Sequence, residues 1–253
     1  MVDLFSGSSA NVIAVLLGLL PSFAWLIFYL KEDSHPEPKR LIALTFLAGG
    51  LFAFFAFFAQ LFLVRLLCGT SGLESSRPFE CLSAADGRLP FFLTFPIFLA
   101  AFALLEEVVK FAAAYFSVHR SKAFNEPVDA MVYMVVAALG FAAVENLGIV
   151  NFGALPAGTP WSETFQTISM RFIGATLLHA LSSAIVGYYW AASIRDFGLK
   201  RPLLWGLFLA TALHAMFNYL ILTYETATYT VVLLVVIGFF VLNDFEKLNR
   251  RAV

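Results

Sequence analysis

Charged residues are scarce in this chain of 253 residues. They make up 13% of the sequence and hydrophobic residues make up 60%, whereas soluble domains are about a quarter charged. So few polar side chains cannot cover a soluble globule, which excludes a cytosolic enzyme and predicts a protein embedded in the lipid bilayer. The net charge is -1, and Lys and Arg occur only in small groups, so nucleic acid is excluded as a partner.

Cysteine is almost absent as well. The two cysteines, Cys68 and Cys81, fall in one polar loop, which excludes a zinc ribbon and a disulfide-dense scaffold. Whether they form a disulfide or stay as thiols is left open by the sequence. No Lys or Arg precedes the first apolar run, so that run is expected to be a retained span and not a cleaved signal peptide.

Seven apolar runs are long enough to cross a membrane, since a bilayer core of about 30 Å needs roughly 20 apolar residues in a helix. The predicted fold class is therefore all-α, a polytopic bundle of about seven transmembrane helices. Without repeats or linkers, the whole chain, 1–253, is expected to form a single integral-membrane domain. The predicted spans are 11–30, 41–67, 91–118, 128–150, 166–192, 203–222 and 228–242.

Lys and Arg are distributed unevenly between the two sets of loops. Eleven of them lie in 31–40, 119–127, 193–202 and the C-terminal tail, and only Arg77 and Arg88 lie in the opposite loops. Because loops rich in Lys and Arg stay in the cytoplasm, the amino terminus is predicted outside and the carboxyl terminus in the cytoplasm. The loop with both cysteines then lies outside, where a disulfide could persist.

A small set of ionisable residues lies inside four consecutive predicted spans. Each charged one costs about 2.5 to 3.5 kcal/mol at the centre of a bilayer. We therefore expect them to face one another or water, in one polar cluster. These residues are Glu106, Glu107, Lys110, Glu145, Arg171, His179 and His214.

Helical spacing predicts contacts within this cluster. Glu106 and Lys110 are four residues apart on one helix face, which favours an ion pair between them. Glu107 is rotated by about 100° from Glu106, so it is expected to point away from Lys110. Arg171 is likewise interpreted as a charge partner. The hydroxyls interpreted as helix-packing groups are Ser182 and Ser183.

Two acids and two histidines at one depth predict hydrolysis of an amide. Glu106 or Glu107 would act as a general base toward water. His214 and Asn218, one turn apart on one helix face, would hold the developing oxyanion, and His179 would protonate the leaving amine.

A bound zinc ion is the alternative mechanism. Two His and one Glu form the ligand set of many hydrolytic zinc sites, and here His179, His214 and Glu145 would supply it. The spacing His-Glu-x-x-His is absent, so the sequence leaves the metal and the glutamate mechanisms open. It also lacks Gly-x-Gly-Asp and Gly-x-Ser-x-Gly motifs, which disfavours aspartyl and serine hydrolases.

Two other classes of protein also bury ionisable groups in a membrane. A proton- or ion-coupled transporter could line its path with Glu106, Glu107, Glu145 and the histidines. A non-catalytic membrane scaffold could keep the fold only to bind partners. The amide of Asn218 favours hydrolysis, because an oxyanion site needs such a donor and a proton path does not.

Four short motifs carry most of these residues, within a core that covers 91–222. They are Glu106-Glu107-Val-Val-Lys110, Phe141-Ala-Ala-Val-Glu145-Asn146, the segment around His179, and His214-Ala-Met-Phe-Asn218. In this order they resemble the motifs of the PrsW family of intramembrane proteases. That family is a branch of the superfamily that includes the CAAX-prenyl endopeptidases and bacteriocin-processing membrane proteins.

The resemblance implies an endopeptidase that cuts membrane-anchored proteins in the bacterial cytoplasmic membrane. The implied catalytic residues are Glu106, Glu107 and His214, supported by Glu145, His179 and Asn218. Members are described as metalloproteases or as glutamic proteases, which implies one divalent metal such as zinc in the first case and no cofactor in the second. The best-known members resemble site-1 proteases that cleave an anti-sigma factor, which implies a partner of that kind.

Overall fold

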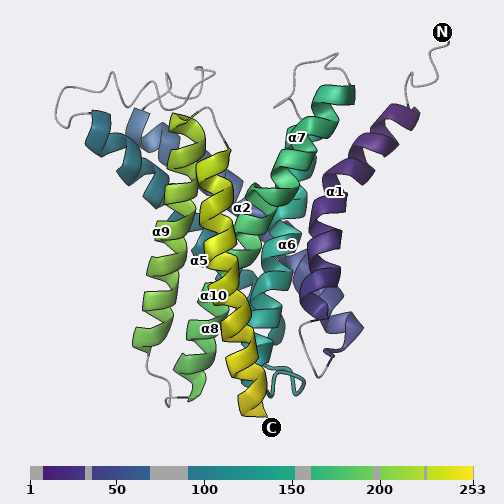
Figure 1. Ribbon diagram of the computed structural model, residues 1–253, viewed down its shortest axis with the longest axis vertical. Coiled ribbons are helices and arrows are strands. Elements are labelled where there is room, and N and C mark those ends of the chain that lie inside the picture. Colours follow the sequence, from purple (N-terminus) through teal and green to yellow (C-terminus); the bar gives the residue numbers. More distant parts are fainter. Residues whose placement is uncertain are drawn as a thin grey trace.

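Helices form all of the regular structure in the computed structural model, which describes residues 8–31, 36–68, 91–151, 161–195, 200–224 and 227–252. The helices are α1 (Ser8–Leu30), α2 (Lys39–Cys68), α5 (Phe91–Val118), α6 (Pro127–Asn151), α7 (Trp161–Ile173), α8 (Ala175–Arg195), α9 (Lys200–Thr223) and α10 (Thr228–Ala252). They run roughly along one axis, with the start of α1 and the end of α10 at opposite ends (Figure 1). The predicted all-α bundle is confirmed.

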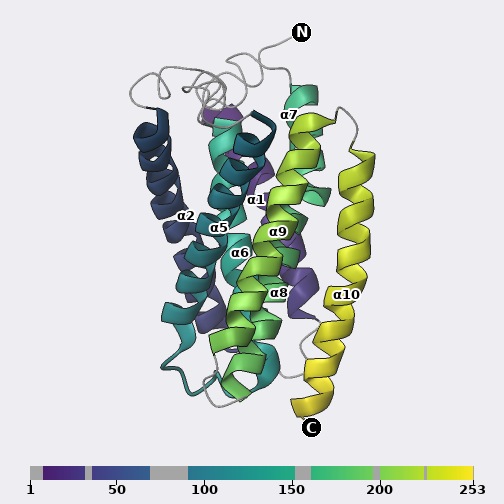
Figure 2. The ribbon, with the colours of Figure 1, turned by 90° about the vertical axis from the view of Figure 1, so that its left-hand side faces the viewer.

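Within the described residues, six helical stretches are long and apolar enough to cross a membrane. α5 has the length of its neighbours, but it carries the charges of Glu106, Glu107 and Lys110. It lies between α2 and α9 and packs against both (Figure 2). All three charged side chains are buried, so the neighbouring helices separate them from lipid.

The predicted fifth span is broken in the structure. The sequence predicts one helix over 166–192, whereas α7 ends at Ile173 and α8 begins at Ala175. A side chain on Gly174 would bring its Cβ within 2.7 Å of the Met170 carbonyl oxygen, so the break needs glycine. Trp25 in α1 donates from Nε1 to the Phe172 carbonyl at 2.8 Å, which supplies a partner for a backbone group in the last turn of α7.

α6 is the central helix of the bundle. Its residues from Val128 to Ala143 are buried without exception, and α1, α2 and α8 pack on it. Small residues allow this close approach. A Cβ on Gly140 would lie 1.9 Å from the Phe46 carbonyl oxygen, and one on Gly49 would lie 2.0 Å from that of Ala137. This close packing fixes the position of α6, the helix that carries Glu145.

The outer surface is strongly apolar. Phe239 is 71% exposed on α10, and a row of phenylalanines is exposed on α2. Soluble proteins rarely expose contiguous apolar surface on this scale, which fits contact with lipid. Whether Cys68 and Cys81 form a disulfide stays open, because Cys81 and the side chain of Cys68 lie outside the described residues.

Candidate active site

The charged residues of α5 form a different pair from the one the spacing predicts. Lys110 Nζ lies 2.6 Å from Glu107 Oε1, and both side chains are 0% exposed. The predicted ion pair between Lys110 and Glu106 is therefore wrong, as is the expectation that Glu107 points elsewhere. Residues three apart are neighbours on a helix as well as residues four apart, and the packing of α8 and α9 selects between them.

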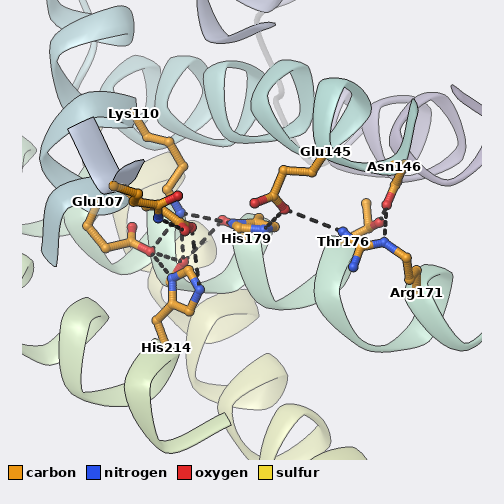
Figure 3. Close-up of polar contacts among 11 residues, drawn as sticks. Glu107, Lys110, Glu145, Asn146, Arg171, Thr176, His179 and His214 are labelled. Atoms are coloured by element: carbon orange, nitrogen blue, oxygen red, sulfur yellow. Dashed lines mark hydrogen bonds and ion pairs between the residues drawn. The ribbon is translucent and has the colours of Figure 1, made fainter. Parts of the chain in front are cut away.

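One oxygen of Glu107 is the hub of the cluster. Oε1 accepts hydrogen bonds from Lys110 Nζ and, at 3.0 Å, from Ser182 Oγ, and it lies 2.8 Å from His214 Nδ1. Figure 3 shows the side chains of Glu107, Lys110 and His214 converging. A buried carboxylate is tolerated when it is paired and hydrogen-bonded in this way. Ser182 was expected only to pack helices, but it contacts the acid.

The contact with Glu107 orients His214. Its Nδ1 faces Glu107 Oε1, so Nε2 faces the other side of the ring and lies 3.6 Å from Glu106 Oε2. When Nδ1 donates to a carboxylate, the lone pair is on Nε2. The ring of His179 meets that of His214 edge to face, with centroids 5.1 Å apart. Nε2 of His214 is therefore available for chemistry beside a second imidazole.

Glu106 has one oxygen bound and one free. Its Oε1 accepts a hydrogen bond of 2.7 Å from Gln60 Nε2 on α2. Its Oε2 is buried and has no hydrogen-bond partner among the described residues. Sequence reasoning missed Gln60, although an amide on the helix face that carries Ala53 and Ala56 was a usable signal.

His179 lies between Lys110 of α5 and Glu145 of α6 and contacts both. Nδ1 lies 3.2 Å from Lys110 Nζ, and Nε2 lies 2.8 Å from Glu145 Oε2. Because an ammonium only donates, Nδ1 accepts and Nε2 donates to Glu145. Arg171 Nη2 lies 3.4 Å from the same oxygen of Glu145, which confirms the prediction that Arg171 is a charge partner. The Glu145 side chain is 32% exposed, far more than the other two carboxylates.

A second set of contacts secures the break between α7 and α8. Arg171 Nε donates to Asn146 Oδ1 at 2.5 Å, and Asn146 Nδ2 donates to Thr176 Oγ1 at 3.1 Å. These contacts continue the row that begins at Glu107 (Figure 3). They tie α6 to the last turn of α7 and the first turn of α8, and so fix the position of Glu145.

Asn218 follows His214 by one turn of α9, as predicted. It is half-buried, and within the described ranges its amide forms no hydrogen bond. Its amide therefore has both donors available, and its predicted role at an oxyanion stays a prediction.

Three buried residues from three helices could hold a metal ion. Glu106, His179 and His214 each offer one ligand atom, and these atoms lie within 4.8 Å of one another. The set differs from the predicted one, because Glu106 replaces Glu145, whose carboxylate is held by His179 and Arg171 instead.

The chemistry of this donor set fits a divalent cation. Two imidazoles and one carboxylate bind catalytic zinc in many hydrolases. The free, buried oxygen of Glu106 is a suitable third donor. His214 is anchored through Nδ1 by Glu107, as a metal-ligating histidine usually is by a carboxylate or carbonyl.

The chain is similar to known membrane proteases over most of its length. The family described as PrsW family intramembrane metalloprotease matches residues 37–243. That range includes every predicted site residue. No solved structure matches the chain.

Several curated proteins are similar to it. Protease PrsW of Geobacillus kaustophilus (strain HTA426) is 31% identical over 210 residues, which cover 82% of this chain and 79% of that protein. Protease PrsW of Oceanobacillus iheyensis is 25% identical over 216 residues, 83% of this chain and 84% of that protein. Protease PrsW of Halalkalibacterium halodurans is 26% identical over 216 residues, 82% of each chain.

Proposed function

Because the chain belongs to the PrsW family of intramembrane metalloproteases, we propose that its buried cluster hydrolyses a peptide bond of a membrane-anchored protein. The observation that carries this proposal is the meeting of Glu106, His179 and His214, whose ligand atoms lie within 4.8 Å of one another inside the bundle. They come from three different helices, α5, α8 and α9, and packing alone does not require that two imidazoles and a carboxylate meet.

We assign Glu106, His179 and His214 to hold a divalent cation, with zinc as the candidate. Because Nε2 of His179 donates to Glu145, His179 would bind through Nδ1, and the cation would replace the Lys110 ammonium that contacts this nitrogen here. Such a cation, when bound, supplies Lewis acidity toward water and toward the carbonyl of the scissile bond. Glu107 orients His214 through Nδ1, and Lys110 neutralises Glu107. In this scheme Glu107 has a supporting role, because its Oε1 contacts Lys110, Ser182 and His214 and so orients the imidazole. Its Oε2, like that of Glu106, is buried and has no hydrogen-bond partner among the described residues.

Glu145 is the proposed acid and base. It is the most exposed carboxylate of the cluster, and both of its described contacts use Oε2, which leaves Oε1 for the attacking water. It would take a proton from that water and return it to the leaving amine. Asn218 would donate from its free amide to the oxygen of the scissile carbonyl.

A glutamic mechanism would use the same residues without a cation. Glu106 would then take the proton from water, since Oε2 is its free oxygen. His214 and Asn218 would hold the oxyanion, and His179 would protonate the amine. The two mechanisms differ in their response to chelation, so one experiment separates them.

The proposed substrate is a membrane-anchored anti-sigma factor, cut on its extracytoplasmic side in the bacterial cytoplasmic membrane. Two expectations support it: the resemblance to site-1 proteases and the orientation that the Lys and Arg distribution predicts. Glu145 lies in the C-terminal part of α6 and contacts Arg171 of α7, and α7 begins at the end of the bundle where α1 starts (Figure 1). This is the outer end in the predicted orientation.

The test is cleavage of a membrane-anchored reporter by the purified protein in liposomes. The wild-type protein should cleave, and Glu106→Gln should not. Glu163→Gln, the same change at an exposed position of α7, is the matched control and should keep full activity. Loss of cleavage with a chelator and recovery with Zn²⁺ would support the metal mechanism, and full activity in chelator would support the glutamic one.

The transporter alternative is judged in the same liposomes. It predicts pH-dependent ion flux without proteolysis. Flux of that kind, together with an intact reporter, would refute the proposed function.

A further inference from the structure

Gln60 occupies an unusual position on α2. The inward face of this helix carries small apolar residues, among them Gly49, Ala53 and Ala56. Gln60 follows Ala56 by one turn on the same face, next to a run of exposed phenylalanines. It is half-buried, and its amide reaches Glu106 of α5.

An amide inside the membrane needs a hydrogen-bond partner from the protein. Hydrocarbon cannot hydrogen-bond to it, so an amide on a lipid-embedded helix is unfavourable unless the protein supplies a partner. The contact that Gln60 makes is the 2.7 Å hydrogen bond from Nε2 to Glu106 Oε1. Leu or Phe, common elsewhere in α2, would fill the same space without that need.

This hydrogen bond determines which oxygen of Glu106 enters the cluster. With Oε1 held by α2, Oε2 lies on the opposite side of the carboxylate, 3.6 Å from His214 Nε2. Oε2 has no other partner in the described part of the chain. Without the amide, rotation of the carboxylate would be limited only by packing.

We propose that Gln60 is a positioning residue of the protease, which fixes the carboxylate of Glu106 so that one oxygen faces the two histidines. α2 thereby contributes to the active site, although none of its residues belongs to the four motifs. The inference rests on the proposed function, because it assumes that Glu106 takes part in hydrolysis.

Gln60→Met is the informative substitution, because Met keeps the length and the unbranched shape but cannot donate. Mutations of groups that orient metal ligands typically lower activity or metal affinity by about 10- to 100-fold. We expect a fall of that size in kcat for reporter cleavage in liposomes, with KM unchanged within about twofold. Phe58→Met, at an exposed position of the same helix, is the matched control and should keep the wild-type kcat.

A second measurement separates positioning from stability. Co²⁺ alone, titrated into the protein and followed by its visible absorption, should bind more weakly to Gln60→Met than to Phe58→Met, while both variants keep the wild-type unfolding temperature. Equal kcat in the two variants would overturn the inference, as would a fall in kcat that only follows a lower unfolding temperature.

Glu106→Gln distinguishes this inference from the proposed function. If Glu106→Gln is inactive and Gln60→Met is fully active, only the role of Gln60 fails. If Glu106→Gln retains activity, the role assigned to Glu106 fails and the inference about Gln60 fails with it. If the wild-type protein leaves the reporter intact, the proposed function itself fails.

Discussion

The ion pair between Glu107 and Lys110 predicts a non-additive effect on stability. Its atoms are 2.6 Å apart and both side chains are 0% exposed, whereas an exposed pair would contribute only about 0 to 1 kcal/mol. Lys110→Met removes one partner and leaves a buried carboxylate without its countercharge. Such a change costs about 3 to 5 kcal/mol.

The expected change in unfolding temperature follows from this free energy. One kcal/mol corresponds to about 2 to 4 °C for a protein of this size, so Lys110→Met should unfold roughly 6 to 20 °C lower than the wild type. Glu107→Gln should also unfold at a lower temperature than the wild type, because it leaves the buried ammonium of Lys110 without its countercharge. The double variant, Glu107→Gln with Lys110→Met, removes both charges and should recover most of the loss.

The assay is thermal unfolding of the four proteins in one detergent, analysed as a double-mutant cycle. The double variant should also remain inactive on the reporter, because His214 loses the carboxylate that orients it. A double variant whose loss equals the sum of the two single losses would refute the reasoning. Lys110→Met at the wild-type unfolding temperature would refute it as well.

Three further predictions follow from contacts in the site and the core. Asn218→Ala should lower kcat by about 10²- to 10³-fold if its amide supports an oxyanion; steady-state kinetics on the reporter measures this, and an unchanged kcat would reject the role. Arg171→Met should raise the sensitivity of α7 to added protease, because the contacts from α7 to Glu145 and Asn146 are lost; an unchanged cleavage rate in α7 would contradict this role of Arg171. Gly140→Val should prevent accumulation of folded protein in the membrane, since a Cβ there would lie 1.9 Å from a backbone oxygen of α2; normal abundance on immunoblots would contradict the tight packing.

The helical bundle was predictable because lipid imposes a simple rule. A helix that crosses a bilayer must be apolar over a fixed length, and each span satisfies that rule by itself. The convergence of Glu106, Glu107, His179 and His214 was predictable for the related reason that isolated charges in lipid are costly. Both inferences need no knowledge of which helices touch.

Individual partners could not be predicted in the same way. Glu106 and Glu107 are both spaced to reach Lys110, and the choice depends on where α2, α8 and α9 place their polar groups. Gln60 contributes to this choice, because its amide binds the carboxylate of Glu106. The sequence does not show which side chain of α2 faces which side chain of α5. The candidate metal set contains Glu106 and not the predicted Glu145 for the same reason, because helix packing determines which carboxylate meets the two histidines.

The break at Gly174 was missed for a different reason. Taken together, residues 162–194 are apolar enough to count as one span, although α7 alone is amphipathic and carries Glu163 and Arg171. The break depends on a carbonyl of α7 finding a donor in α1, through Trp25. That contact joins residues 147 positions apart, which is beyond the reach of any local pattern.

The candidate ligands come one each from α5, α8 and α9, and this has a consequence during synthesis. A growing chain holds two of them once α8 has entered the membrane, and it gains the third only with α9, the next helix. Until then the proposed hydrolytic centre is incomplete. A protease assembled in this order stays inert while it is still beside the insertion machinery and the other nascent proteins there.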